Sequence, residues 1–214
     1  MKANIQKRAL ILIDVQNEYV IGNLQIEYPP LDISLPNIAK AVVQARAYGI
    51  PVVVVKQEAP ITSPIFALGS KEAELHPMIK SIAADLVVVK SLPSALAGTV
   101  LDGWLRGHSV ETLVVAGFMS QNCVESTSRH AAHEGWQVEY LHDASGTVSF
   151  KNKMGFLSAQ AMHEASCIVL QSRFAVVLQT NEWCELVSRG FSACKESILE
   201  SVERAQRKRH TLCD

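Results

Sequence analysis

Short, uninterrupted apolar runs recur along this chain, and stretches with a helical spacing of apolar residues separate them. Such runs are typical of strands that are buried on both faces of a sheet. They lie at residues 9–13, 52–55, 86–89, 113–116, 138–141 and 168–170. Helices are expected at 36–48, 73–82, 95–106, 121–134 and 152–164. This alternation predicts βαβ units and an α/β fold, in which helices cover both faces of a parallel sheet.

Glycines and two irregular stretches divide the chain further. Gly49, Gly107 and Gly135 each follow an expected helix, at the position where a left-handed residue often ends one. Residues 57–76 predict a loop longer than an ordinary strand-to-helix connection, and such loops are often functional. From about residue 180 the pattern predicts one or two helices that end in a basic tip. We therefore expect a helical extension over 181–214, packed on the preceding part of the chain or on a neighbouring subunit.

Charge and hydropathy exclude several classes of protein. Twenty Lys and Arg residues against 21 Asp and Glu leave a formal net charge of −1, which argues against nucleic acid or an anionic membrane as a partner. No apolar run approaches the roughly 18 residues of a membrane-spanning helix. The polar start leads directly into the first expected strand, without a signal-peptide pattern. A cytoplasmic protein with no membrane or nucleic-acid partner is expected.

Cysteine usage points to chemistry rather than to cross-links. The five cysteines form an odd set without a CxxC pair, so a disulfide framework or a zinc ribbon is not expected. Cys123 stands apart because it begins an expected helix directly after a strand. We expect the other cysteines to be inert and several histidines to be surface residues or to have their hydrogen bonds satisfied in the fold. These residues are Cys167, Cys184, Cys194, Cys213, His108, His130, His133 and His163.

Three residues with reactive side chains lie at the carboxyl ends of expected strands, where open α/β sheets bind ligands. Asp14 follows the first strand, Lys90 ends the third, and Cys123 follows the fourth. Singly, Asp14 could cap a helix or hold Mg²⁺, Lys90 could extend to water, and Cys123 could be a small buried apolar residue. Their coincidence at one edge of the sheet favours a catalytic function.

Together these residues predict an acyl-transfer site. A helix N-terminus and a nearby Lys90 would lower the pKa of the Cys123 thiol. Asp14 could take the thiol proton and return it to a leaving group. Backbone N–H groups between Met119 and Cys123 could stabilise an oxyanion.

The segments that carry these residues resemble the isochorismatase-like cysteine hydrolases. They are LILIDVQN at 10–17, KSLPSA at 90–95 and GFMSQNCV at 117–124, and the resemblance runs over about 8–177. SPIF at 63–66, ELHP at 74–77 and HDA at 142–144 add to it. The resemblance implies a hydrolase domain over 1–180, with a three-layer αβα fold around a six-stranded parallel sheet, assembled into dimers or tetramers.

The same resemblance implies roles for individual residues. Asp14 matches the catalytic aspartate, Lys90 the lysine and Cys123 the nucleophile of the family. A cis peptide is implied between Phe118 and Met119, which would direct the Met119 and Cys123 N–H groups at the oxyanion. Hydrolysis of an amide or similar C–N bond through a thioester is the expected activity.

Departures from the family pattern narrow the expectation. Metal-dependent nicotinamidases of this superfamily carry histidines after the second strand, whereas this chain has KQEAP at 56–60. No metal and no cofactor are therefore expected. Two alternatives stay open, vinyl-ether cleavage of isochorismate and a catalytically silent binding or assembly protein. The substrate is expected to be a small molecule, and Asn17, Tyr19 and Phe66 are candidate substrate-binding residues on loops at the same edge of the sheet.

Overall fold

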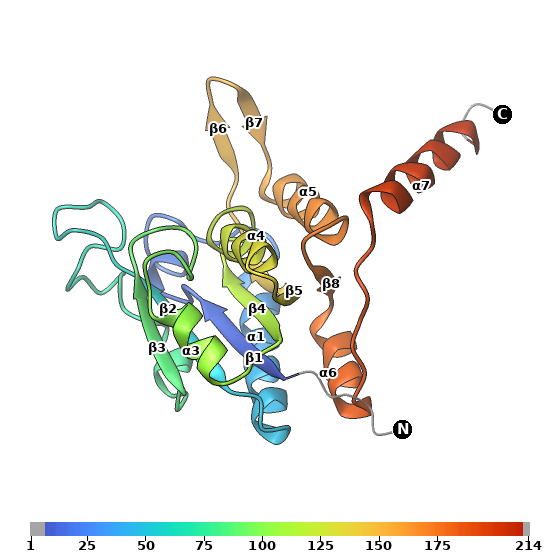
Figure 1. Cartoon of the computed structure of the whole chain (residues 1–214). Helices are drawn as coiled ribbons and strands as arrows, with labels where there is room; N and C mark the ends of the chain where they lie inside the picture. Colours follow the sequence, from blue (N-terminus) through green and yellow to red (C-terminus); the bar gives the residue numbers. More distant parts are fainter. Residues whose placement is uncertain (1–6, 212–214) are drawn as a thin grey trace.

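Six strands form one parallel sheet in the computed structural model, which describes residues 7–211 and side chains as far as 207 (Figure 1). Their order across the sheet is β3-β2-β1-β4-β5-β8. The bounds are Arg8–Ile13 for β1, Val52–Gln57 for β2, Leu86–Lys90 for β3, Thr112–Phe118 for β4, Gln137–Gly146 for β5 and Val176–Leu178 for β8. The chain reverses its direction of travel across the sheet between β1 and β4, so the carboxyl ends of these neighbouring strands border a switch point where such sheets bind ligands.

The central strand β1 shows why the apolar runs are uninterrupted. All six of its residues are buried. Leu10 and Leu12 face one apolar core, whereas Ile11 and Ile13 face the other. After Arg8, whose charge is paired with Glu139, every residue of β1 is apolar, because helices cover both faces of the strand.

Helices cover both faces of the sheet, which confirms the three-layer αβα architecture. One core receives side chains from α1 (Leu31–Ala47), the short α2 (Pro77–Lys80) and α6 (Thr180–Arg189). The other receives side chains from α3 (Leu101–Gly107), α4 (Glu125–His133) and α5 (Ala159–Gln171). No helix within the described residues is long and apolar enough to cross a membrane.

The prediction of the sixth strand at 168–170 was wrong. Those residues belong to α5, where Ile168 is largely exposed and Leu170 is buried, and the sixth strand is β8. The helix expected over 152–164 was wrong in its first part, because β6 (Phe150–Asn152) and β7 (Gly155–Leu157) form an antiparallel hairpin. The hydroxyl of Ser158 then accepts the Ala161 N–H and begins α5. The hairpin projects from the body of the molecule (Figure 1).

Other element boundaries moved for local reasons. The helix expected from 95 begins only at Leu101, since the Ala95 N–H bonds to Thr127 of α4 and Thr99 Oγ1 accepts the Leu101 N–H. The helix expected over 73–82 contracts to Pro77–Lys80. Gly49 and Gly135 have positive φ angles as predicted, but after α3 the positive φ falls at Ser109 and not at Gly107. Strand β3 lies at the edge of the sheet, so Val87 and Val89 are exposed rather than buried.

The C-terminal part of the chain forms two helices of different character. Helix α6 packs on the sheet, where Trp183 is fully buried and its indole N–H donates to Glu139 Oε2 at 2.9 Å. Arg8 binds the same Glu139 carboxylate through two hydrogen bonds and also donates to the Phe191 carbonyl. Helix α7 (Ile198–Thr211) extends away from the body (Figure 1). Cys213 lies outside the described residues.

Candidate active site

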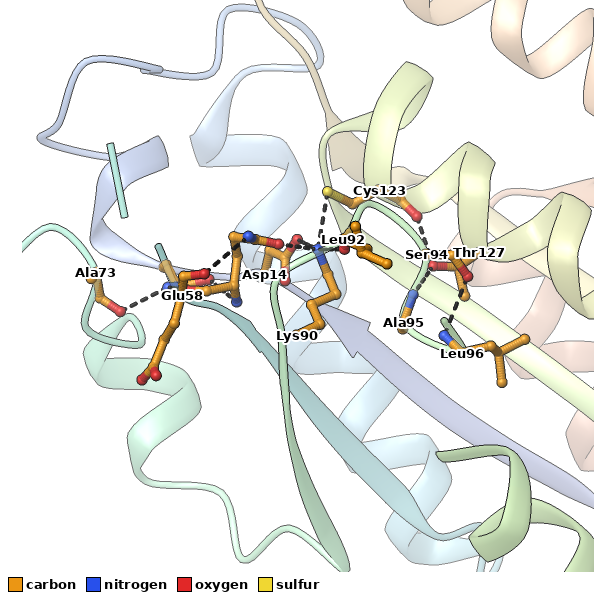
Figure 2. Close-up of polar contacts among 12 residues, drawn as sticks. Asp14, Glu58, Ala73, Lys90, Leu92, Ser94, Ala95, Leu96, Cys123 and Thr127 are labelled. Carbon is orange, nitrogen blue, oxygen red and sulfur yellow. Dashed lines mark hydrogen bonds and ion pairs between the residues drawn. The ribbon is translucent and has the colours of Figure 1, made fainter. Parts of the chain in front are cut away.

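The structure brings Asp14, Lys90 and Cys123 together at the carboxyl edge of the sheet. The Lys90 ammonium lies 2.8 Å from Asp14 Oδ2 and 3.2 Å from the Cys123 sulfur. Figure 2 shows the lysine reaching from the end of β3 to a point between the carboxylate and the sulfur. Asp14 and Lys90 are almost completely buried, and Cys123 lines a pocket. Three residues far apart in sequence therefore form one contiguous group.

Asp14 is held by an unusual turn of the chain directly after β1. Its φ angle is 51°, in the left-handed region that Asp tolerates better than most residues. Its N–H donates to the Val55 carbonyl at 3.0 Å. The neighbouring strand β4 can approach because residue 117 is glycine, since a Cβ there would lie 2.0 Å from the Ile13 carbonyl oxygen. The close approach of two backbones thus fixes the aspartate beside β4.

Lys90 has a complete set of partners. Besides Asp14 and Cys123, its ammonium donates to Gln57 Oε1 at 2.7 Å and to the Leu92 carbonyl at 3.2 Å. Gln57 ends β2, between the strands that carry Asp14 and Lys90. A buried ammonium needs such compensation because desolvation penalises its charge. The amide of Gln57 and the carbonyl of Leu92 therefore help to keep the lysine in place as a cation.

Cys123 lies in a π-helix, Ser120–Val124, which leads directly into α4. The Met119 carbonyl accepts the N–H groups of both Asn122 and Val124. The peptide between Phe118 and Met119 is cis. Thr127 joins this element to the segment that follows Lys90. Its hydroxyl donates to the Cys123 carbonyl at 2.7 Å and accepts the Ala95 N–H at 2.9 Å (Figure 2). Cys123 and the loop that follows Lys90 are thus linked through one threonine.

The electrostatics of the site differ from the expectation. Burial raises the pKa of the Cys123 thiol to about 12; the Asp14 charge acts in the same direction and Lys90 opposes both. The expected lowering of the Cys123 pKa was therefore wrong, because desolvation outweighs the lysine. Burial also raises the pKa of Asp14, and Lys90 counteracts this shift. Burial therefore favours the protonated thiol of Cys123, and Lys90 opposes the rise in the pKa of both groups.

A pocket of about 280 Å³ opens above the sulfur of Cys123. Its lining is mostly apolar, with polar contributions from Gln57, Asn122 and two serines. Tyr19 and Phe66 both line it, and their rings contact each other edge to face with centroids 5.4 Å apart. Asn17 does not line it, and its amide instead donates to the Lys71 carbonyl at 2.9 Å. Two of the three candidate substrate-binding residues thus lie at the pocket, and the third holds a loop.

Three residues that help to hold the candidate site in place were not found by the sequence analysis. Gln57 could have been found, because it ends a strand between those of Asp14 and Lys90. Thr127 lies one helical turn after Cys123, but only the folded chain reveals its bond to Ala95. The buried Glu18 carboxylate accepts the N–H groups of Asn23 and Phe66 and so braces the pocket loop. Nothing in the local sequence marks that role.

Two potential metal ligands on the segment between β2 and α2 have partners of their own. Glu58 forms an ion pair with Lys56 at 2.6 Å. His76 Nδ1 accepts the Met78 N–H at the start of α2. A cluster of His142, His163 and Cys167 does have ligand atoms close together, but it contains none of the residues that line this pocket.

Comparisons with known proteins agree with this geometry. The sequence pattern of the Isochorismatase domain family matches residues 8–182. A secreted isochorismatase effector from Verticillium dahliae is 35% identical over 144 residues, which cover 67% of this chain and 75% of the relative. A ureidoacrylate amidohydrolase, RutB, from Acinetobacter baylyi is 25% identical over 211 residues, covering 83% and 82% of the two chains.

A solved structure gives a close match in three dimensions. It is a protein from Burkholderia xenovorans that was provisionally named an isochorismatase. The two chains are 50% identical, with a TM-score of 0.95 over 97% of this chain and 100% of the other. The sheet order and the covering helices described above are therefore those of a known architecture.

Proposed function

The chain belongs to the isochorismatase family of hydrolases, and we propose that it cleaves a carbon–nitrogen bond of a small, uncharged amide through a thioester on Cys123. One observation carries the proposal. The Lys90 ammonium lies within 2.8 Å of Asp14 and 3.2 Å of the Cys123 sulfur, at the base of an apolar pocket. A thiol, a proton acceptor and a cation in mutual contact are what nucleophilic acyl transfer requires.

The proposed reaction begins with transfer of the Cys123 proton to Asp14. The sulfur forms a bond to the amide carbon, and the carbonyl oxygen becomes an oxyanion. The carbon–nitrogen bond then breaks, and the amine leaves with the proton that Asp14 held. Water next gives a proton to Asp14 and attacks the thioester, which releases the acid and restores the thiol. In acylation and again in hydrolysis of the thioester, Asp14 first accepts a proton and then donates it.

The remaining charges have definite tasks. Lys90 opposes the rise in the pKa of both Asp14 and Cys123, so it keeps the carboxylate available as a base and stabilises the thiolate as it forms. The N–H groups of Met119 and Cys123 are our candidates for the oxyanion hole. One donor of this kind contributes about 3 kcal/mol in other enzymes.

The lining of the pocket supports an uncharged substrate. Among the described residues that line it, none has a charged side chain, and the nearby Lys90 is already paired with Asp14. A free carboxylate on the substrate would lose its hydration without gaining a cation. This argues against isochorismate, the substrate of the vinyl-ether alternative, because it carries two carboxylates. Ureidoacrylate, named for the relative from Acinetobacter baylyi, also carries a carboxylate, so we expect a different substrate here.

A matched panel of substrates tests the proposal. It contains primary amides and ureides of increasing apolar size, each paired with an analogue that bears a carboxylate, and also isochorismate. Release of amine or ammonia and rapid-quench intact mass spectrometry report turnover and an acyl group on Cys123. We expect activity on the uncharged members, an acyl adduct in the wild type, and neither in Cys123→Ala. Turnover that persists in Cys123→Ala would rule out the thioester, and inactivity on every member would favour a silent protein.

We also propose a homo-oligomer of two or four chains in the cytoplasm. Several apolar side chains on the β6–β7 hairpin and on α7 are exposed, as expected for surfaces that pack on another copy. They are Phe150, Met154, Phe156, Leu157, Ile198, Leu199 and Val202. Light scattering after size-exclusion chromatography measures the assembly. Cell fractionation tests the location, which matters because a relative is named a secreted effector.

A further inference from the structure

A second group of reactive side chains lies behind the element that carries Cys123. His142 comes from β5, and His163 and Cys167 lie one turn apart on α5. The ligand atoms of these three residues lie within 4.8 Å of one another. We propose that they bind a divalent cation of the Zn²⁺ type. This site is separate from the proposed hydrolytic site and does not depend on that function.

The spacing of two of the ligand atoms already fits zinc. Cys167 Sγ lies 3.6 Å from His163 Nε2. Zinc binds thiolate sulfur at about 2.3 Å and imidazole nitrogen at about 2.0–2.1 Å in a tetrahedron, which places the two donors about 3.6 Å apart. An i, i+4 pair on a helix can hold this distance without distortion of the backbone. Only the half-buried His142 has to move to complete the set.

The hydrogen bonds of His163 leave the correct nitrogen free. The Ser145 hydroxyl donates to the Gly117 carbonyl at 2.5 Å, so Ser145 can only accept from Ser120 at 3.2 Å. Ser120 in turn accepts from His163 Nδ1 at 2.7 Å. This assignment places the proton on Nδ1 and directs the lone pair of Nε2 toward Cys167. Histidines that bind metals usually donate their other N–H in this way.

The donor set selects the class of ion. Two imidazoles and one thiolate suit a borderline metal such as Zn²⁺, whereas Mg²⁺ and Ca²⁺ prefer oxygen ligands. The rings of Tyr28 and His142 flank the buried His163, with centroids 5.6 Å and 6.0 Å away. Ser120 is the first residue of the π-helix that holds Cys123, so a bound ion would brace that helix from behind.

Metal analysis of the full-length protein tests the proposal. Chelator-treated protein is loaded with Zn²⁺, passed through a desalting column and analysed for metal content. A parallel sample is loaded with Co²⁺, whose thiolate complexes absorb in the near ultraviolet. We expect one equivalent of zinc and a thiolate-to-cobalt band in the wild type. His142→Ala and Cys167→Ser should weaken binding by about 100-fold or more, and Cys167→Ser should abolish the band.

Two other cysteine variants serve as matched controls. Cys184→Ser changes a half-buried free cysteine on α6, and Cys123→Ser changes the proposed nucleophile; both should bind zinc as the wild type does. Circular dichroism of the metal-free variants checks their folding, and His142→Ala, at a half-buried position, keeps the test available if Cys167→Ser does not fold. The proposal fails if the wild type binds no stoichiometric zinc, if the two ligand variants bind it unchanged, or if binding disappears in Cys123→Ser.

Discussion

The Lys90 ammonium contacts both the Asp14 carboxyl group and the Cys123 thiol. Burial favours the neutral form of each of these two groups. Without the ammonium, desolvation would raise the pKa of Asp14 further and would leave the Cys123 thiol still harder to ionise. The ammonium counteracts both shifts and so favours the ionised forms of Asp14 and Cys123. In the proposed mechanism, Asp14 therefore takes the thiol proton at the moment of attack, and a permanent thiolate is not needed.

Removal of the lysine tests this view. In Lys90→Met, the loss of the nearby cation removes an influence that lowers the pKa of the Cys123 thiol, so this pKa should rise further. Thiolate is the reactive form, so alkylation by iodoacetamide should require a higher pH than in the wild type, and turnover should fall. The uncompensated Asp14 charge should also cost about 3–5 kcal/mol of folding stability. Lys56→Met, which changes a partly exposed ion pair with Glu58, is the control. An unchanged alkylation profile in Lys90→Met would contradict the role.

Substitution of Asp14 should shift the pH dependence of Cys123 alkylation in the opposite direction. The Asp14 charge raises the pKa of the Cys123 thiol, so Asp14→Asn lowers it and alkylation should proceed at lower pH. Turnover should nevertheless fall by about 100-fold or more, because the proton acceptor is lost. Alkylation followed by mass spectrometry, together with steady-state kinetics, measures both effects. A variant with full activity would show that Asp14 is not the base.

At the scale of the element, the junction of β4 with the π-helix depends on Gly117. Any Cβ at this position meets the Ile13 carbonyl oxygen at 2.0 Å, and the φ angle of 111° is unfavourable for other residues. We expect Gly117→Ala to lower the free energy of unfolding by about 3–5 kcal/mol. The measurement is denaturant unfolding followed by circular dichroism.

Gly103→Ala provides the matched control for that measurement. Gly103 lies inside α3, and a Cβ there meets no atom within 4 Å. Alanine is the better helix former, so this variant should be more stable by about 0.5–1 kcal/mol. If both substitutions changed the free energy of unfolding equally, the close contact of residue 117 with Ile13 would not be what destabilises Gly117→Ala.

At the scale of the whole molecule, α6 completes one of the two cores although it follows the last strand of the sheet. Trp183 is fully buried and bonds to Glu139, which also binds Arg8 from β1. A chain ending after residue 179 should therefore lose more than about 3 kcal/mol of stability and fail to fold. A chain ending after residue 191 keeps these contacts and should unfold at nearly the wild-type midpoint. Stable folding of the shorter chain would support the predicted domain boundary at residue 180.

The order of residues along the chain determined the architecture and the identity of the candidate site. Most of the uninterrupted apolar runs became strands of the sheet, because a strand covered on both faces is apolar at nearly every position. Once the strands are parallel, Asp14, Lys90 and Cys123 must lie at the same edge, because each follows or ends a strand. Periodicity and sequence position are local properties, so a single chain contains this information.

Tertiary packing decided the rest, because desolvation and close approach depend on segments that are distant in sequence. The apolar run at 168–170 has the composition of a strand, but it faces partly to solvent in α5, and β8 takes the edge of the sheet. The direction of the Cys123 pKa follows from burial among several elements, which no local pattern encodes. The third and fourth partners of Lys90 and the bridge from Thr127 to Ala95 likewise exist only after the strands have been placed.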